Sequence, residues 1–119
     1  MTGYPHPGSA SLLAKRLLSQ RAERQQLLGP ELGSEPAWSM LLALFIAYED
    51  GEPAAVKELC AGAGVPPAAA RRWLSTLASE GKVNWWTATQ DPERARVDLS
   101  SEMADQLRTL FRRWMEVSP

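Results

Sequence analysis

The segment from Val56 to Val83 constrains the fold of this chain more than any other part of the sequence. It reads VKELCAGAGVPPAAARRWLSTLASEGKV, in which a glycine-containing turn separates two short helical patterns. Pro66 or Pro67 suits the first position of the second helix, where no backbone N–H is needed, and Gly81 is a natural stop. Three apolar residues of that helix share one face by their i, i+4, i+7 spacing: Ala70, Leu74 and Leu77. The pattern predicts two helices packed through a tight turn.

A leucine-rich helix is predicted near the N-terminus, starting at Ser9 or Ser11 and ending at about Leu28. Residues 1–8 are polar and rich in proline, so we expect them to form a disordered tail. The glycines and prolines of residues 29–36 predict a linker.

A second helix is predicted to begin at Ala37 and to end at Gly51. Its sequence, AWSMLLALFIAYEDG, has Ser39 as its only polar residue before Glu49, so we expect this helix to be buried nearly all round. Pro53–Ala61 is predicted to be the short helix before the glycine turn, with Cys60 as a small buried hydrophobic residue on it.

A β-hairpin and a final helix are predicted after Gly81. The stretch KVNWWTAT is rich in residues that favour strands, and ARVDLS alternates so that Val97 and Leu99 share a face. Between them, QDPER carries the Asp-Pro pair typical of a turn. Trp85 and Trp86 are adjacent on a strand, so one should enter the core and the other should remain near the surface. An amphipathic helix then runs from Ser101 to near the C-terminus.

This order of elements is the layout of a winged helix-turn-helix. Over Pro36 to about Phe111, in the segments PAWSMLLALFIAYEDG, VKELCAGAGVPPAAARRWLSTLASEGKV and DPERARVDLS, the sequence resembles the MarR-type family of winged-helix transcriptional regulators. The resemblance implies a mostly α fold, with a two-stranded β-hairpin wing and flanking N- and C-terminal helices around a winged helix-turn-helix domain at 36–100. It also implies sequence-specific binding of double-stranded DNA and transcriptional regulation, most simply as a dimeric repressor.

In that family the second helix of the pair lies in the DNA major groove. Carried over to this sequence, its DNA-binding positions are Pro67, Ala68, Ala69, Arg71, Arg72 and Ser75. Alanines allow close approach to the duplex, and an arginine can bind guanine through two hydrogen bonds. Many family members carry Ser, Gln or Thr at positions 67–69, so direct readout should be weaker here and DNA shape more important. The alternative is that both arginines are ordinary solvated residues.

The hairpin would be the wing, with Arg94 and Arg96 at its tip. In the family an arginine of the wing enters the minor groove and is held by a nearby aspartate, and Asp91 with Arg94 looks similar. The family spacing is a tighter Asp-x-Arg, so either arginine is a candidate for insertion. The alternative is a solvated turn with one surface ion pair.

The flanking segments, residues 9–35 and 101–119, are expected to form a homodimer, because they carry more leucine than a small domain can bury. The candidate interface residues are Leu13, Leu17, Leu107, Leu110, Phe111 and Trp114. The alternative is a monomer whose first helix folds back on its own core. Small aromatic effectors are common in the family, so such a ligand is a further candidate partner, although no residue set here specifies one.

Composition excludes several other classes of function. The chain has one cysteine, which excludes an internal disulfide, and one histidine, His6, which lies between two prolines. A single Cys and a single His do not favour a metal site or nucleophilic catalysis. We therefore expect no enzyme, metal or cofactor. No apolar run is long enough to cross a membrane and no signal peptide is present, which favours a cytoplasmic protein.

An alternative function is a winged helix that binds proteins without binding DNA. Three features favour it: the net charge of −1, the acidic residues between Glu49 and Glu58, and the alanine-rich helix. A ligand-sensing dimer whose DNA binding is secondary is the third hypothesis.

Overall fold

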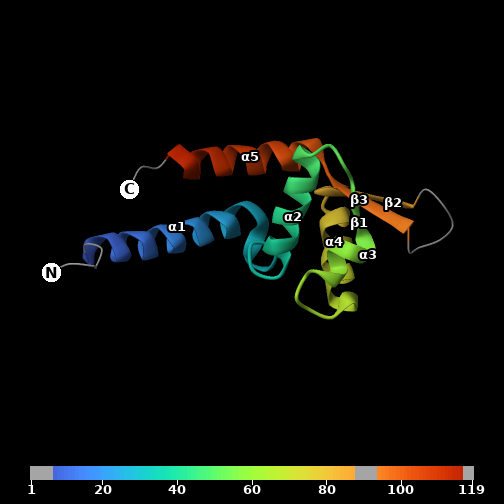
Figure 1. Ribbon diagram of the computed structural model, residues 1–119, viewed down its shortest axis with the longest axis horizontal. Helices are drawn as coiled ribbons and strands as arrows, with labels where there is room; N and C mark the ends of the chain where they lie inside the picture. Colours follow the sequence, from blue (N-terminus) through green and yellow to red (C-terminus); the bar gives the residue numbers. More distant parts are fainter. Residues whose placement is uncertain (1–6, 88–93, 117–119) are drawn as a thin grey trace.

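The computed structural model describes residues 7–87 and 94–116 of the chain. In chain order the elements are α1 (Pro7–Leu32), α2 (Ala37–Glu49), β1 (Ala54–Ala55), α3 (Val56–Ala61), α4 (Pro67–Ser79), β2 (Val83–Thr87), β3 (Ala95–Leu99) and α5 (Ser101–Glu116). The molecule is elongated, 64 × 28 × 26 Å, because α1 and α5 extend from one side of the body that α2–α4 and the sheet form (Figure 1). This is the mostly α winged helix-turn-helix fold that the sequence predicts.

The core lies where α2, α3, α4 and the start of α5 meet the sheet. Apolar side chains from every one of these elements are almost fully buried there, including Leu41, Leu44, Val56, Leu74, Leu77, Val97, Leu99 and Met103. Cys60 is among them, as predicted. No polar or charged side chain of the described residues is fully buried, so hydrophobic burial is the dominant force that holds this body together.

The sheet contains one strand more than the predicted hairpin. The hairpin forms as β2 and β3, with Trp85 opposite Val97, but β1 pairs antiparallel with the other side of β3. The prediction of a helix from Pro53 is therefore wrong for Ala54 and Ala55, and α3 begins only at Val56. Alanine has little intrinsic preference for strands, and the pairing depends on β3, more than 40 residues away in the sequence.

The first helix starts earlier and ends later than predicted. It includes Pro7 and Gly8, which the sequence placed in a tail; residues 1–6, His6 among them, lie outside the described part of the chain. At Gly29 the backbone leaves the helical region (φ 88°, ψ 162°), and one further helical turn follows, so the expected linker is partly helical. Gly33 then packs against the backbone of α1: a Cβ there would lie 2.8 Å from the carbonyl oxygen of Arg24, which only glycine avoids.

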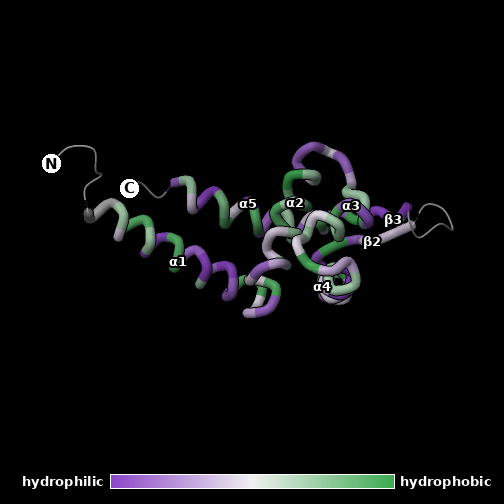
Figure 2. The backbone as a smooth tube through the Cα atoms, turned by 60° about the horizontal axis from the view of Figure 1, so that its bottom comes forward, coloured by the Kyte–Doolittle hydropathy of each residue, from purple (hydrophilic) through white to green (hydrophobic). Residues whose placement is uncertain are grey.

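The second helix is not buried all round, contrary to the prediction. Its inner face is buried, but Leu42 and Ala43 are exposed and Ile46 has 61% of its surface exposed. The hydropathy of α2 is nearly uniform around the helix, so the sequence contains no signal that distinguishes the covered face from the uncovered one. Figure 2 shows this hydrophobic helix at the centre of the molecule, with hydrophobic and hydrophilic residues alternating along α1.

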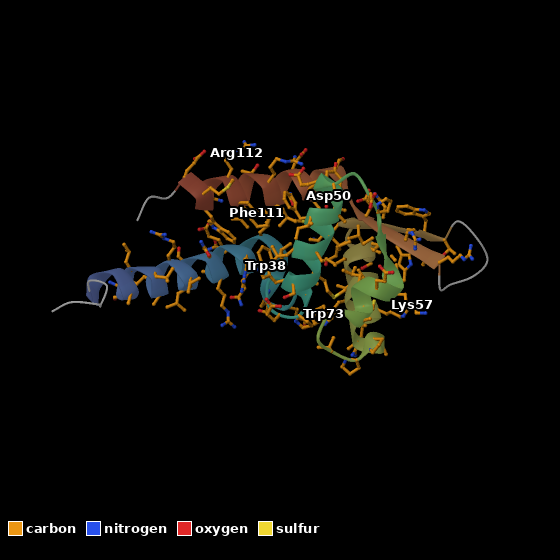
Figure 3. The ribbon with its side chains drawn as sticks, viewed as in Figure 1. Trp38, Asp50, Lys57, Trp73, Phe111 and Arg112 are labelled. Atoms are coloured by element: carbon orange, nitrogen blue, oxygen red, sulfur yellow. The ribbon has the colours of Figure 1, made fainter. Side chains whose placement is uncertain are left out.

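Aromatic rings and ion pairs join α1 and α5 to the body. Trp38 contacts Phe111 and Trp114 edge-on at centroid distances of 6.0 and 6.1 Å, and Arg24 lies 4.9 Å from the Trp38 ring (Figure 3). Glu23 accepts a hydrogen bond from the indole of Trp114 at 3.4 Å and pairs with Arg113 at 3.3 Å. These contacts hold the inner half of α1 beside α5, whereas the leucines of its outer half, such as Leu13 and Leu17, are exposed.

Candidate nucleic-acid interface

The helix α4 begins and ends where the sequence predicts. Pro66 precedes it and Pro67 is its first residue, with the Pro66 carbonyl accepting hydrogen bonds from the N–H groups of Ala69 and Ala70. At the other end, the Lys82 N–H donates to the Leu77 carbonyl across Gly81, which closes the last turn. Both ends of the helix are thus determined by local sequence.

Opposite faces of α4 have opposite roles. Ala70, Leu74 and Leu77 have no exposed surface and anchor the helix to the core, as predicted. The predicted DNA-binding residues do not share one environment: Pro67, Ala68, Arg72 and Ser75 are exposed, whereas Ala69 and Arg71 are half-buried. Arg72 is therefore the basic side chain of α4 that is most open to a ligand. Trp73 is half-buried and packs against the core.

The wing presents one aromatic and one basic residue side by side. Trp86 and Arg96 are direct cross-strand partners, Arg96 is exposed, and Trp86 is 40% exposed. Trp85 points the other way and packs against the core beside its partner Val97. The sequence predicted that one of the two tryptophans would enter the core. Cross-strand partners share a face of the sheet, so the inward-facing Val97 would have identified Trp85 as the buried one once the strand register was known.

The tip of the wing lies partly outside the described residues. Arg94 is exposed at the start of the return strand, whereas Asp91 belongs to residues 88–93, which the structure does not describe. The predicted pairing of Asp91 with Arg94 therefore stays a prediction.

The predicted interface residues separate into three groups. Leu13 and Leu17 are exposed on the outer half of α1, Leu17 with 56% of its surface. Phe111 and Trp114 are half-buried in the aromatic cluster around Trp38. Leu107 and Leu110 form the third group and are buried in the core, with 0% and 3% of their surface exposed. Those two leucines pack inside their own chain, so they offer almost no surface to a second copy, contrary to the expectation.

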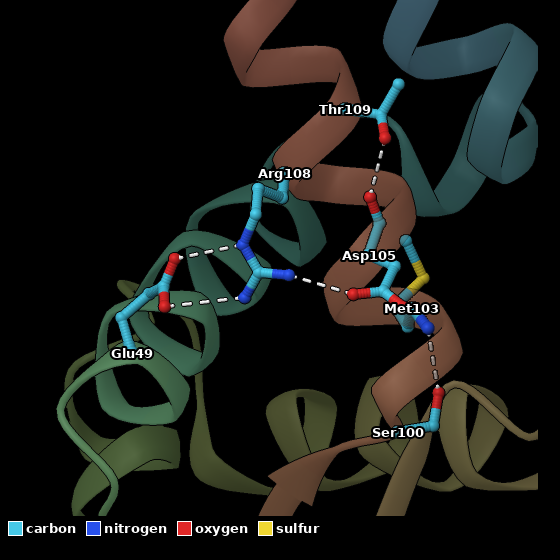
Figure 4. Close-up of polar contacts among 6 residues, drawn as sticks. All are labelled: Glu49, Ser100, Met103, Asp105, Arg108 and Thr109. Atoms are coloured by element: carbon cyan, nitrogen blue, oxygen red, sulfur yellow. Dashed lines mark hydrogen bonds and ion pairs between the residues drawn. The ribbon is translucent and has the colours of Figure 1, made fainter.

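An ion-pair network joins the end of α2 to α5. Arg108 contacts both carboxylate oxygens of Glu49 at 3.4 Å and Asp105 at 2.8 Å, and these contacts raise the pKa of its guanidinium, the hydrogen bond to Glu49 most strongly (Figure 4). At the start of α5 the Ser100 hydroxyl accepts a hydrogen bond from the Met103 N–H at 3.1 Å, so Ser100 is the N-cap of a helix that begins at Ser101, as predicted. The network and the cap orient α5 relative to the body.

Within the described residues, no group of three His, Cys, Asp or Glu side chains could hold a metal ion. No helix in residues 7–87 or 94–116 is both long and apolar enough to cross a membrane.

The chain has the winged helix-turn-helix fold of MarR-type regulators, in agreement with the resemblance seen in the sequence. The MepR–DNA complex from S. aureus superposes with a TM-score of 0.65 at 10% identity, over 89% of this chain and 84% of that one. Rv1404 from Mycobacterium tuberculosis gives 0.62 at 19% identity, over 94% and 79%. The transcriptional regulator PA3341 gives 0.53 at 25% identity, over 87% and 73%. No family model matches the sequence, and no curated protein shows significant sequence similarity to it.

Proposed function

We propose that this chain binds double-stranded DNA sequence-specifically and regulates transcription as a dimeric repressor, without catalytic activity. The observation that carries the proposal is the outward face of α4, where Ala68, Arg72 and Ser75 are exposed on a helix anchored by its opposite face. A structure with the same fold is a complex with DNA, that of S. aureus MepR.

In the proposed complex α4 lies in the major groove and the wing reaches the adjacent minor groove. Arg72 would read guanine, and the small side chain of Ala68 would let the helix backbone approach the bases. Arg94 and Arg96 would neutralise phosphates or enter the minor groove. Few hydrogen-bonding side chains face outward on α4, so much of the selectivity should come from DNA shape.

The proposed dimer pairs the projecting segments of two copies about a two-fold axis. Leu13 and Leu17 are large apolar side chains with 52% and 56% of their surface exposed, and burying them favours association. Two α4 helices about 34 Å apart would meet successive major grooves on one side of the duplex, so the operator should be nearly palindromic.

A small aromatic effector has a candidate site between α1 and α5. A cleft of about 560 Å³ lies there, lined by Glu23, Gln26, Leu27, Asp105, Gln106, Thr109, Leu110 and Arg113. Its volume lies within the range of small-molecule sites. A related fold, S. aureus MepR, has been solved with ethidium bromide bound. We propose that a ligand at this cleft would change the position of α5 relative to the body and so the spacing of the α4 helices.

A binding selection on random duplex DNA tests the main proposal. Enrichment of a nearly palindromic sequence, with affinity that falls steeply as salt rises, is the expected result. Enrichment of no sequence and the absence of any salt-dependent binding would contradict it.

The rival hypothesis, a winged helix that binds a protein, is favoured by one observation. The α2 face with Leu42 and Ile46 is apolar, exposed and bordered by acidic residues, which is unsuitable for DNA but suitable for a polypeptide. The same DNA-binding assay separates the two hypotheses, because a protein-binding module would show no salt-dependent affinity for duplex DNA.

A further inference from the structure

An apolar groove runs along α2 where α3 packs beside it. Two adjacent hollows, of about 400 and 140 Å³, share Ala43, Glu58 and Leu59 and so form one continuous depression. Its lining extends from Ser39, near the start of α2, to Asp50, just after the end of that helix. At a rise of 1.5 Å per residue this is a length of about 17 Å, enough for about three turns of a helix laid along it.

Large apolar side chains are exposed along the α2 side of the groove. Ile46 lines the wider hollow and has 61% of its surface exposed. Leu42 lies one turn earlier on the same helix and is exposed as well, and Leu59 is half-buried on the α3 side. Residues four apart on a helix are surface neighbours, so Leu42 and Ile46 form one apolar ridge. Apolar side chains that are exposed together in this way mark an interaction site.

Acidic side chains accompany the groove along its whole length. Asp50 and Glu52 line its wider end, and Glu58 on α3 lines both hollows (Figure 3 labels Asp50). At the narrower end, Ser39 donates a hydrogen bond to the carboxylate of Glu35. Among the described residues that line the two hollows, none is a lysine or an arginine. The groove is therefore unsuitable for DNA and complementary to an occupant that carries positive charge along its length.

An amphipathic helix with basic flanks fits both properties of the groove. Such a helix lays apolar side chains spaced at i, i+4 and i+7 into a groove of this kind, and lysine or arginine beside that apolar stripe faces the carboxylates. The outer half of α1 from a second copy does not fit, because Lys15 and Arg16 line a hollow with Trp114 on the side of α1 toward α5, opposite the exposed Leu13 and Leu17. The complementary helix therefore belongs to a different protein.

We propose that the groove between α2 and α3 binds a basic amphipathic helix of a different protein. The apolar residues of that helix pack on Leu42, Ile46 and Leu59, and its lysine or arginine side chains face Asp50 and Glu58. This inference goes beyond the proposed function and does not depend on it. The groove shares no lining residue with the outward face of α4 or with the wing, so the docked helix and DNA occupy different surfaces.

Titration with a designed peptide tests the docking. The probe is a fluorescein-labelled peptide of leucine and lysine, about four helical turns long, with its leucines on one face. Fluorescence anisotropy measures its binding to the full chain, and saturable binding is expected. Two control peptides should bind at least about tenfold more weakly: one of the same composition in scrambled order, which has no apolar face, and one with glutamate in place of lysine.

Ile46→Glu separates docking from simple charge attraction. The variant puts a carboxylate into the apolar contact and also makes the groove more acidic. It should therefore weaken peptide binding by roughly tenfold if the leucines pack there, because the new carboxylate would be buried in the contact, whereas charge attraction alone would strengthen the binding. The matched control is Ser79→Glu, which adds the same charge at the exposed end of α4, outside the groove, and should leave peptide binding unchanged.

Glu58→Lys tests the acidic border. It should weaken peptide binding by roughly fivefold, in line with the loss of an exposed ion pair. Glu58 and Ile46 are both exposed, so both variants should keep the circular dichroism spectrum of the natural sequence. Glu58→Lys binding the peptide as tightly as the natural chain would contradict the assigned border.

Several results would overturn the docking itself: no saturable binding of the leucine–lysine peptide, equal binding of the scrambled peptide, or undiminished binding to Ile46→Glu. Light scattering adds a further outcome, since a halved mass in Ile46→Glu alone would mean that a second copy occupies the groove. The proposed function is tested separately, because Ile46→Glu should keep the duplex affinity of the natural sequence. A natural chain that binds no duplex would contradict the proposed function, and the peptide titration would still decide the docking.

Discussion

At the scale of single residues, burial separates the side chains that could bind DNA from those that hold the fold. Leu74 and Ser75 are neighbours in the sequence, but Leu74 is completely buried and Ser75 is exposed. The same division distinguishes Arg72, which is exposed, from Arg71, which is half-buried.

The first prediction follows from the exposure of Arg72. Arg72→Ala should weaken operator binding by about 1–3 kcal/mol and relax the preference at one base position, provided that its guanidinium binds a guanine. Arg71→Ala should have a smaller effect. Titration of labelled duplexes measures both, with Ser79→Ala at the exposed end of α4 as the control. Equal, wild-type affinity in both arginine variants would show that α4 does not lie in the groove as proposed.

The second prediction concerns the buried face of α4. Leu74→Ala should lower the free energy of unfolding by about 2–5 kcal/mol, because it removes methyl groups from a packed core and leaves a cavity. Ser75→Ala, on the next residue, should leave stability nearly unchanged and serve as the matched control. Urea denaturation followed by circular dichroism measures the difference, and similar midpoints for the two variants would contradict the assigned helix orientation.

The third prediction concerns Cys60. Burial raises the pKa of its thiol from the ordinary value of 9.0, while the charge of Arg71 acts in the opposite direction. The neutral thiol of the folded protein should react slowly with thiol reagents at neutral pH, and unfolding should expose it. Because the raised pKa favours the neutral form in the folded state, its contribution to stability should be complete below pH 9 and decline as pH rises further. Labelling as fast as that of a free thiol would contradict this environment.

At the scale of elements, the wing is the part of the molecule whose contribution to binding should be least dependent on DNA sequence. Arg94 directly precedes β3, Arg96 is the second residue of β3, and both are exposed. Contacts to phosphates and to the minor groove carry little base information.

The fourth prediction is therefore a loss of affinity on all duplexes alike. Arg94→Ala and Arg96→Ala should each lower affinity without changing sequence preference, and each lost phosphate contact should reduce the slope of log affinity against log salt by about one. Binding isotherms at several salt concentrations give the slopes. Glu102→Ala, on α5, is a control that should not reduce them. Unchanged affinity and slope in both arginine variants would favour the protein-binding rival.

At the scale of the whole molecule, the exposed leucines of α1 dominate the expected association behaviour. They project from an elongated chain in which α1 and α5 leave the body on one side. Leu110, by contrast, is buried beside α1, so a substitution there changes the fold before it changes any interface.

The fifth prediction distinguishes these two leucines. Light scattering at micromolar concentration should give twice the chain mass for the natural sequence and a mass near 13.1 kDa for Leu17→Glu, with helix content largely retained. Leu110→Glu should instead lower the unfolding midpoint, because a buried carboxylate without a partner is costly. A natural-sequence chain that stays monomeric, or a Leu17→Glu chain that stays dimeric, would contradict the assignment of Leu17 to the interface.

The sequence by itself determined the features that depend on near neighbours along the chain. Proline at the start of α4, glycine after its end and the spacing of Ala70, Leu74 and Leu77 act within a few residues of one another, so they predicted the helix and its buried face correctly. The hairpin and the overall winged helix layout followed from the same kind of local signal.

Only the tertiary structure decided which surfaces are covered. Nothing near Ala54 indicates a strand until β3 lies beside it, and a uniformly apolar α2 cannot indicate in advance that Ile46 will remain exposed. Likewise, helical spacing makes Leu107 and Leu17 look equivalent, but Leu107 faces the core and Leu17 does not. Helix caps and periodicity are properties of a single segment, so the candidate DNA-binding helix could be predicted from the sequence. Burial depends on contacts between elements that are distant in sequence, so the residues of the candidate interface could be predicted only in part.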